Sequence, residues 1–196
     1  MGSRERKKVA THQAMVDAAA RLFAERGVEA TTMEDIARAA GTSRTSVFNY
    51  FGYKEMILCE IGARYVAQIA GAAGVVPRRS PRQRLYDMVD IVAQLTQREP
   101  ELLAAIAREM THPDPDRRRM AAETMQYGTM VETTLDLLEA TGRLRAPERR
   151  STYARLVIDM VAGTIIRSGG DFPAARLRTE LRHGADLFLD GALKPS

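Results

Sequence analysis

Cysteine is nearly absent from the 196-residue sequence, in which Cys59 is the only one. A single cysteine excludes an intramolecular disulfide and a cysteine-based metal cluster, and we expect it to pack in the interior. No apolar run approaches the roughly 18 residues that a membrane helix requires. The first residues, Met1 to Lys8, are polar and basic, unlike a secretory signal. We therefore expect a cytoplasmic protein in a reducing compartment, with no membrane association.

Motifs of catalysis and metal binding are also missing. The sequence contains no Gly-rich phosphate loop, nucleophile elbow, His-Glu-x-x-His motif or catalytic histidine cluster. His112 and His183 are better interpreted as satisfied or exposed side chains than as metal ligands. We expect no catalytic residues, no metal and no cofactor, which argues against an enzyme.

Strand signals are nearly absent, because the apolar residues recur at helical spacing and the segments between breakers exceed the length of typical strands. The pattern predicts an all-α fold of about nine helices. The first runs from about Thr11 to Arg26, two short helices follow, and an unbroken fourth helix runs from Lys54 to about Ala73. Five more helices are expected at about 82–97, 100–110, 117–141, 148–168 and 173–190.

Positive charge is concentrated at the front of the chain. Residues 1–54 carry nine Lys or Arg against six Asp or Glu, whereas residues 55–196 carry twenty against nineteen. The leader contributes most of this excess, through Arg4, Arg6, Lys7 and Lys8. It is either a solvated, frayed terminus or an arm that contacts phosphates, and the charge alone leaves both open.

A tight turn, Gly41-Thr42-Ser43, separates the second and third helices. Gly41 can adopt the positive φ that ends one helix, and Ser43 can cap the next within two residues, so the two helix axes cross steeply. Three short helices followed by a longer one, with such a turn, have the proportions of a helix-turn-helix, here residues 32–51.

The third helix is expected to present a polar surface to DNA. Arg44 can donate a forked pair of hydrogen bonds to guanine and Asn49 can bond adenine. The hydroxyls of Thr45 and Ser46 can contact bases or phosphates, and Tyr50 can contact the DNA backbone or a thymine methyl group. The predicted set is Arg44, Thr45, Ser46, Asn49 and Tyr50. The alternative is an ordinary solvent-facing surface, but the position of the set directly after the turn favours DNA recognition.

Two helix starts offer phosphate sites. Thr32 places a hydroxyl and unpaired backbone amides at the start of the second helix, and Lys54 places an ammonium at the start of the fourth. Thr31 with Glu34, or Thr32 with Asp35, has the spacing of a capping box. The alternatives are simple capping for Thr32 and a solvated side chain for Lys54.

Four segments within Ala10 to Leu58 resemble the TetR family of bacterial regulators. They are Ala18–Gly27, Thr31–Ala37, Ala39–Gly41 and Tyr50–Glu55, in the family's order and spacing. The resemblance implies an all-α homodimer whose recognition helices bind double-stranded DNA at a palindromic operator, usually repressing nearby genes until a small molecule occupies the carboxy-terminal domain. We therefore expect a DNA-binding domain with a basic arm at 1–54 and an effector-binding and dimerisation domain at 55–196.

Two positions differ from the family pattern. Where Phe48 stands, family members often have a tyrosine that contacts a phosphate. Phenylalanine has no hydroxyl, and its spacing with Val47 and Phe51 suits burial, so we expect Phe48 to pack rather than bind. Thr42 occupies a turn position that is commonly valine.

No motif beyond residue 73 identifies an effector. Methionine adapts to irregular apolar ligands, although it more often fills a core. If the effector is an apolar small molecule, the helices around the sensor core should supply its pocket. The candidates are Tyr86, Met88, Met110, Tyr127 and Met130.

Two apolar stripes suggest a dimer interface on the last two helices. Two such helices from each of two subunits would form a four-helix bundle. The alternative is that both stripes cover the subunit's own core, but reading two operator half-sites requires a dimer. The candidates are Leu156, Met160 and Gly163 on one helix and Leu177, Leu181 and Phe188 on the other.

Two other classes remain as alternatives to a regulator: a non-catalytic helical partner-binding protein and, less favoured, an enzyme. Salt-dependent, sequence-selective DNA binding would discriminate the regulator from both.

Overall fold

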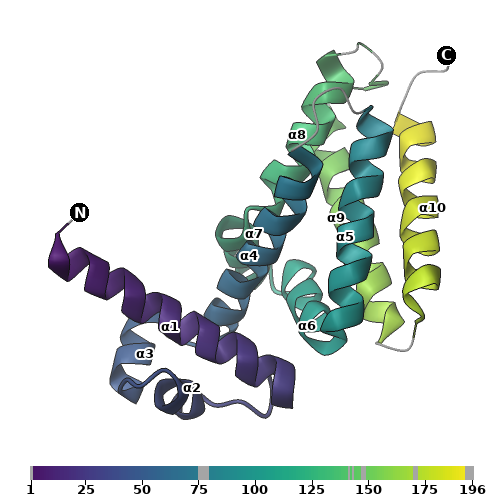
Figure 1. Ribbon diagram of the computed structural model, residues 1–196. Coiled ribbons are helices and arrows are strands. Elements are labelled where there is room, and N and C mark those ends of the chain that lie inside the picture. Colours follow the sequence, from purple (N-terminus) through teal and green to yellow (C-terminus); the bar gives the residue numbers. More distant parts are fainter. Residues whose placement is uncertain are drawn as a thin grey trace. The chain divides into compact units, whose positions relative to one another are not determined.

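The computed structural model describes residues 2–74, 80–140, 142, 144–146, 149–169 and 172–192. These residues form an all-α fold of ten helices, one more than the sequence predicts (Figure 1). In chain order they are α1 (Ser3–Arg26), α2 (Met33–Ala39), α3 (Arg44–Phe51), α4 (Lys54–Gly74), α5 (Pro81–Arg98), α6 (Pro100–Met110), α7 (Pro115–Met125), α8 (Tyr127–Ala140), α9 (Arg150–Ser168) and α10 (Ala174–Ala192). None of the described helices is both long enough and apolar enough to cross a membrane.

The additional helix arises because the segment predicted as one helix at 117–141 is two. Gln126 adopts a left-handed conformation with φ of 53° and separates α7 from α8. A left-handed residue ends a helix because its carbonyl no longer points along the axis. Gln126 is neither Gly nor Pro, so the sequence carries no local signal for this break. The start of α7 is also earlier than predicted, because Asp114 caps it and Pro115 occupies its first position.

The first helix also begins earlier than predicted, at Ser3 rather than Thr11. The leader contains no breaker and is rich in Arg, Glu and Lys, which favour helix. Its residues 3–10 are exposed on the first turns of α1. The basic leader is therefore helical rather than frayed, and its positive charge lies on a defined element.

The chain forms two compact units, Met1–Gly62 and Ala63–Ser196, which divide inside α4. The first unit contains α1, α2, α3 and the first turns of α4. Its interior is apolar, with Met15, Phe23, Ile36, Val47 and Ile57 all at 1% exposure or less. Cys59 is buried with them. This core fixes α1, α2 and α3 relative to each other and so positions the surface of α3.

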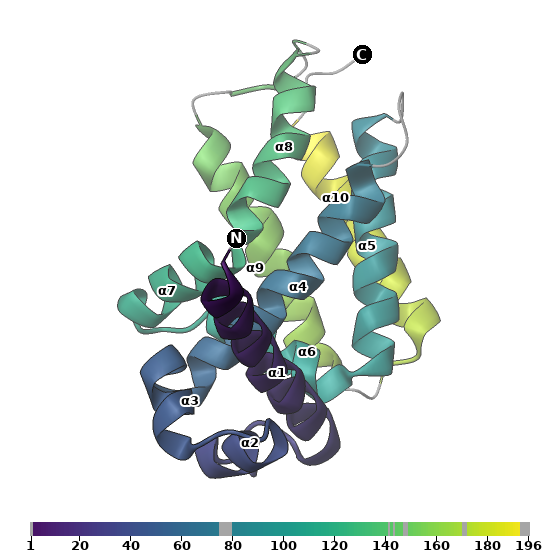
Figure 2. The same cartoon turned by 60° about the vertical axis from the view of Figure 1, so that its left-hand side comes forward.

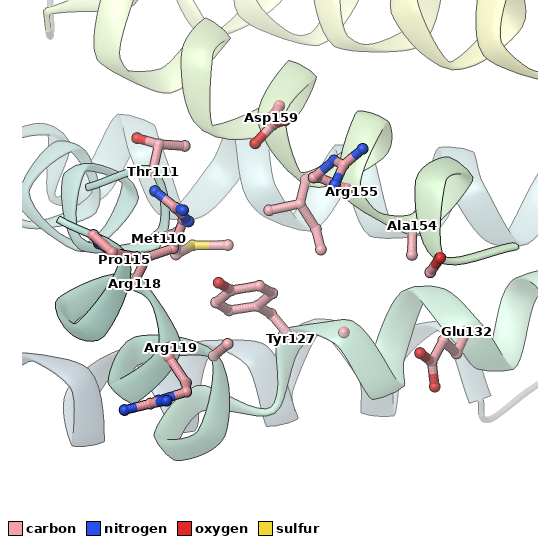
Figure 3. Close-up of a pocket in the computed structure, with 14 residues that line it drawn as sticks. Met110, Thr111, Pro115, Arg118, Arg119, Tyr127, Glu132, Ala154, Arg155 and Asp159 are labelled. Atoms are coloured by element: carbon pink, nitrogen blue, oxygen red, sulfur yellow. The ribbon is translucent and has the colours of Figure 1, made fainter. Parts of the chain in front are cut away.

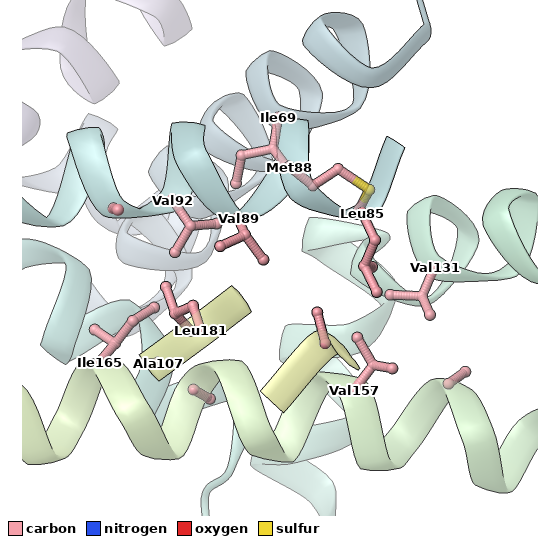
Figure 4. Close-up of a cluster of buried hydrophobic side chains, with 14 of the residues drawn as sticks. Ile69, Leu85, Met88, Val89, Val92, Ala107, Val131, Val157, Ile165 and Leu181 are labelled. Atoms are coloured by element: carbon pink, nitrogen blue, oxygen red, sulfur yellow. The ribbon is translucent and has the colours of Figure 1, made fainter. Parts of the chain in front are cut away.

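The second unit is built around one continuous apolar core. Figure 4 shows side chains from the end of α4 and from α5, α6, α8, α9 and α10 meeting in it. Helix α10 lies beside α5, and α8 lies beside α9 (Figures 1 and 2). The members labelled in the close-up are Ile69, Leu85, Met88, Val89, Val92, Ala107, Val131, Val157, Ile165 and Leu181. Because α9 and α10 contribute to this core, part of their apolar surface is used inside the chain.

Candidate DNA-binding surface and sensor cavity

A complete capping box starts α2. Oγ1 of Thr32 accepts from the backbone amide of Asp35 at 3.1 Å, and the Asp35 carboxylate accepts from the backbone amide and hydroxyl of Thr32 at 3.1 and 2.6 Å. These hydrogen bonds hold the pKa of Asp35 below its usual value. Thr31, the other candidate cap, is instead buried, and its hydroxyl donates to the carbonyl of Gly27 at 2.8 Å.

The turn between α2 and α3 has the predicted chemistry. Gly41 adopts a φ of 65°, where a side chain would be strained. Ser43 caps α3 by accepting from the backbone amide of Ser46 at 3.1 Å, and the hydroxyls of these two serines lie 2.8 Å apart. Only four residues, 40–43, therefore separate the end of α2 from the start of α3, as a helix-turn-helix requires.

The outer surface of α3 carries the predicted polar residues and one unexpected aromatic ring. Val47 and Phe51 are buried against the rest of the unit. Phe48 is 40% exposed, so the prediction that it packs inside is wrong. Since four residues make about one turn, Phe48 shares its face with Arg44, and the Arg44 guanidinium carbon lies 5.2 Å from its ring centroid.

The remaining predicted DNA-contacting residues of α3 differ in exposure. Thr45 and Asn49 are exposed, whereas Ser46 and Tyr50 are half-buried. Tyr50 lies beside His12 of α1, with ring centroids 5.8 Å apart. The His12 Nε2 lies 3.2 Å from Oε1 of Glu60 on α4. Through these two contacts of His12, the end of α3 is held beside α1 and α4. The sequence carries no signal for the His12–Glu60 contact, because the two residues are 48 positions apart.

Lys54 has a structural role that the sequence did not predict. Its ammonium donates to the carbonyls of Val28 at 2.8 Å and Glu29 at 3.3 Å, and the side chain is 20% exposed. It also lies 3.6 Å from the Glu29 carboxylate. Lys54 therefore ties the start of α4 to the loop between α1 and α2, which limits the donors it can offer to a phosphate.

The second unit contains a cavity of about 600 Å³ bounded by α6, α7, α8 and α9 (Figure 3). The ring of Tyr127 projects into it, and Arg118 and Arg119 lie toward one end while Glu132 lies toward the other. Arg118 donates to the carbonyl of His112 at 2.7 Å. The lining residues are Met110, Thr111, Pro115, Arg118, Arg119, Ala122, Tyr127, Gly128, Glu132, Ser151, Ala154, Arg155, Ile158 and Asp159.

Of the predicted effector residues, Met110 and Tyr127 line this cavity and the other three do not. Met88 is buried in the core, and Met130 packs against that core. The hydroxyl of Tyr86 donates to the Asp186 carboxylate on α10 at 2.5 Å. The prediction missed Arg118, Arg119 and Arg155, because these residues are exposed and the local sequence does not show which exposed side chains border a cavity.

The residues predicted for the dimer interface also differ in whether the structure leaves them accessible. Leu177 is 2% exposed and Leu181 is 0% exposed, and both lie in the chain's own core. They have no surface to offer a second copy, so their assignment to the interface is wrong. The exposed apolar residues of α9 and α10 are Leu156 at 53% and Leu187 at 69%, and the sequence singled out only the first.

The other three members of the predicted interface are half-buried. Met160 packs so closely on Gly184 of α10 that a Cβ atom there would clash with it. The ring of Phe188 packs edge-on against Tyr153 of α9, with centroids 6.0 Å apart. The remaining member is Gly163. Contacts inside the chain therefore occupy much of this stripe.

A helix-turn-helix unit followed by a helical unit is an organisation typical of DNA-binding transcriptional regulators. Residues 15–61 match the model of bacterial regulatory proteins of the tetR family. Residues 67–191 match that of the TetR/AcrR family transcriptional repressors, C-terminal domain. The chain belongs to the TetR/AcrR family of helix-turn-helix transcriptional repressors, which is not a family of enzymes.

Individual relatives agree with this assignment. The crystal structure of FadR from Thermus thermophilus, a TetR family transcriptional repressor in complex with lauroyl-CoA, is 31% identical, with a TM-score of 0.81 over 94% of this chain and 96% of that one. The repressor KstR of Rhodococcus jostii is 26% identical over 92% of this chain and 84% of its own length. The regulator BetI of Agrobacterium fabrum is 28% identical over 79% of this chain and 75% of its own length.

Proposed function

We propose that this repressor binds a palindromic operator as a homodimer and releases it when an acyl-CoA thioester occupies the cavity of the second unit. The observation that carries the effector assignment is the composition of that cavity, which is lined by apolar residues and three arginines together with Glu132 and Asp159. An acyl-CoA complements the apolar residues and the arginines, because its apolar chain joins a head that carries several phosphates.

The apolar part of the cavity suits the acyl chain. Met110, Tyr127 and Ile158 supply flexible, aromatic and branched surface. A volume of about 600 Å³ is within the range of pockets that hold small-molecule ligands.

The arginines suit the phosphates, because guanidinium groups donate forked hydrogen bonds to them. Arg119 pairs with exposed Asp116 at 3.0 Å, a surface ion pair that contributes little to stability. Glu132 lies toward the opposite end of the cavity (Figure 3). We therefore assign the phosphate-bearing head to the end formed by α7 and the acyl chain to the Tyr127 side.

Similarity supports the same ligand class. FadR of Thermus thermophilus, in complex with lauroyl-CoA, aligns over nearly the whole of both chains. We take an acyl chain of that length as the first ligand to test.

The homodimer is proposed on the exposed surfaces of α9 and α10. Leu156 and Leu187 are the two exposed large apolar side chains on these helices. Their burial in a two-fold interface would remove them from water and would place two copies of α3 on one operator.

Coupling is proposed to pass through α4. This helix is continuous from Lys54 to Gly74 and therefore belongs to both units. A displacement of its second half by the effector would change the separation of the two recognition helices, and half-sites about 34 Å apart tolerate little mismatch. By linkage, effector and DNA weaken each other's binding by the same factor.

The experiment is a competition between operator and ligand. An operator selected from random DNA is bound to the full chain, and lauroyl-CoA, free CoA and lauric acid are titrated separately. Lauroyl-CoA should release the operator, whereas neither half of the molecule should do so at the same concentration.

Two variants locate the ligand. Arg119→Ala should weaken lauroyl-CoA binding roughly tenfold, because a charge-assisted hydrogen bond to phosphate is lost. Arg108→Ala removes an exposed arginine of α6 that does not line the cavity, and it should leave ligand affinity unchanged. Release by lauric acid alone, or equal affinity of lauroyl-CoA for free and operator-bound protein, would contradict the acyl-CoA assignment.

A further inference from the structure

Phe48 is an aromatic side chain that the core of the first unit does not use. It is 40% exposed on α3, whereas Val47 and Phe51 of the same helix are buried. A single exposed ring is ordinary on a protein surface, but on a DNA-recognition helix it is available to an apolar group of the DNA, and such a contact would remove it from water. The floor of the major groove offers one apolar group, the C5 methyl of thymine.

Arg44 lies over this ring. Its guanidinium carbon is 5.2 Å from the ring centroid, within the range of a cation–π contact. Among the described residues it has no hydrogen-bond or ion-pair partner, so its forked donors are available to a ligand. The ring restrains a long side chain that would otherwise lose conformational entropy on binding. The Arg44 side chain is therefore already positioned before DNA binds, with its hydrogen-bond donors beside an exposed aromatic ring.

We propose that Arg44 and Phe48 act as one recognition unit, in which Arg44 bonds O6 and N7 of a guanine while Phe48 packs on the methyl group of a nearby thymine. This inference rests on the proposed binding of α3 in the major groove. Arg44 and Phe48 lie one helical turn apart on α3, and side chains at this spacing project about 5–6 Å apart. Because base pairs stack about 3.4 Å apart, we expect the thymine within two base pairs of the guanine. Phe48 thus becomes a specificity-determining residue.

The test uses DNA in which single groups are removed. In an operator obtained by selection, the thymines are replaced one at a time by deoxyuridine, which lacks only the methyl group. At the thymine contacted by Phe48, this change in one half-site should weaken wild-type binding about fourfold, as loss of a buried methyl contact implies, and in both half-sites about fifteenfold. Replacing the adjacent guanine by 7-deazaguanine removes N7 and should weaken binding that depends on Arg44.

Variants assign each effect to its residue. Phe48→Ala should weaken binding to the thymine operator and should no longer distinguish thymine from deoxyuridine, which is the signature of coupling in a double-mutant cycle. Phe48→Leu keeps an apolar contact without a π surface, so it should retain part of the methyl preference and lose part of the guanine preference. Val9→Ala shortens another exposed apolar side chain, outside α3, and should keep the wild-type ratio between the two operators.

Different outcomes test the Arg44–Phe48 recognition unit and the operator binding on which it rests. If the selected operator is bound tightly but no deoxyuridine substitution weakens binding, or if Phe48→Ala keeps the wild-type ratio, the recognition unit does not exist although the protein still reads DNA. The recognition unit would also be overturned by a selected operator that has no thymine within two base pairs of the guanine contacted by Arg44. If selection yields no preferred sequence, the proposed operator binding itself fails. Circular dichroism of Phe48→Ala checks that the variant is folded.

Discussion

The hydroxyl of Tyr65, on α4, donates a 2.5 Å hydrogen bond to Oε2 of Glu99, the residue between α5 and α6. Burial and the neighbouring carboxylate both raise the pKa of Tyr65, so the hydroxyl stays protonated and remains a donor at neutral pH. The bond joins α4 to the start of α6, and the far end of α6 carries the cavity residue Met110. It therefore connects a wall of the cavity to the helix that continues into the first unit.

Removing this hydroxyl should change coupling more than folding. Tyr65→Phe should lower the free energy of unfolding by about 1 kcal/mol, since it deletes one half-buried hydrogen bond. It should also reduce the factor by which lauroyl-CoA weakens operator binding by at least about twofold. Urea unfolding and titrations with and without operator measure the two effects. A variant with unchanged coupling would show that this bond is only structural.

The capping box of α2 should contribute to acid sensitivity. The hydroxyl and amide of Thr32 hold the pKa of Asp35 below its ordinary value of 3.8. A lowered carboxyl pKa stabilises the folded state above the unfolded-state pKa, and this contribution is lost as the pH falls through the folded-state pKa. Stability attributable to Asp35 should thus be constant from pH 7 to about 5 and decline below about pH 4.

Amide exchange in α2 measured between pH 6 and pH 3 checks this. Asp35→Asn should reduce protection at pH 6 and flatten its further loss on acidification. Glu34→Gln removes the same charge from the same helix without touching the cap, and it should retain the wild-type decline. Identical pH profiles for wild type and Asp35→Asn would contradict the expected contribution.

Lys54 should affect both stability and DNA binding. Because its ammonium donates to the carbonyls of Val28 and Glu29, Lys54→Ala should destabilise the protein by about 1–2 kcal/mol. If Lys54 also contacts a phosphate, all DNA sequences should bind more weakly and the slope of log affinity against log salt should fall by about one.

Thermal unfolding and salt titrations separate the two roles. Glu29→Ala removes a carboxylate that is 98% exposed and should cost little, because exposed ion pairs contribute weakly. A full salt slope in a destabilised Lys54→Ala variant would assign Lys54 to the fold alone.

Charges on α9 and α10 should distinguish interface from core. Leu156→Glu and Leu187→Glu place a carboxylate at exposed positions and should dissociate the dimer while the helical content stays unchanged. Leu181→Glu places it in the core and should cost more than about 3 kcal/mol, so that the chain unfolds. Sedimentation and circular dichroism report the two outcomes. A dimer that survives both exposed substitutions would locate the interface elsewhere.

The sequence by itself determined the elements that depend on residues within four positions of one another. Thr32 with Asp35, Gly41, and Ser43 with Ser46 specify two caps and a turn through short-range hydrogen bonds and backbone freedom, so the helix-turn-helix and the polar surface of α3 were predictable. Helical apolar spacing likewise determined the all-α class.

Only the tertiary structure decided which surfaces are covered. Leu177 and Leu181 have the same spacing as an interface stripe, but the unit's own helices bury them, whereas Phe48 has the spacing of a core residue and remains exposed. The left-handed Gln126 and the arginines around Tyr127 carried no local signal either. Burial, a strained turn and a cavity depend on neighbours distant in the chain, because an amphipathic helix specifies that one face is covered but not what covers it.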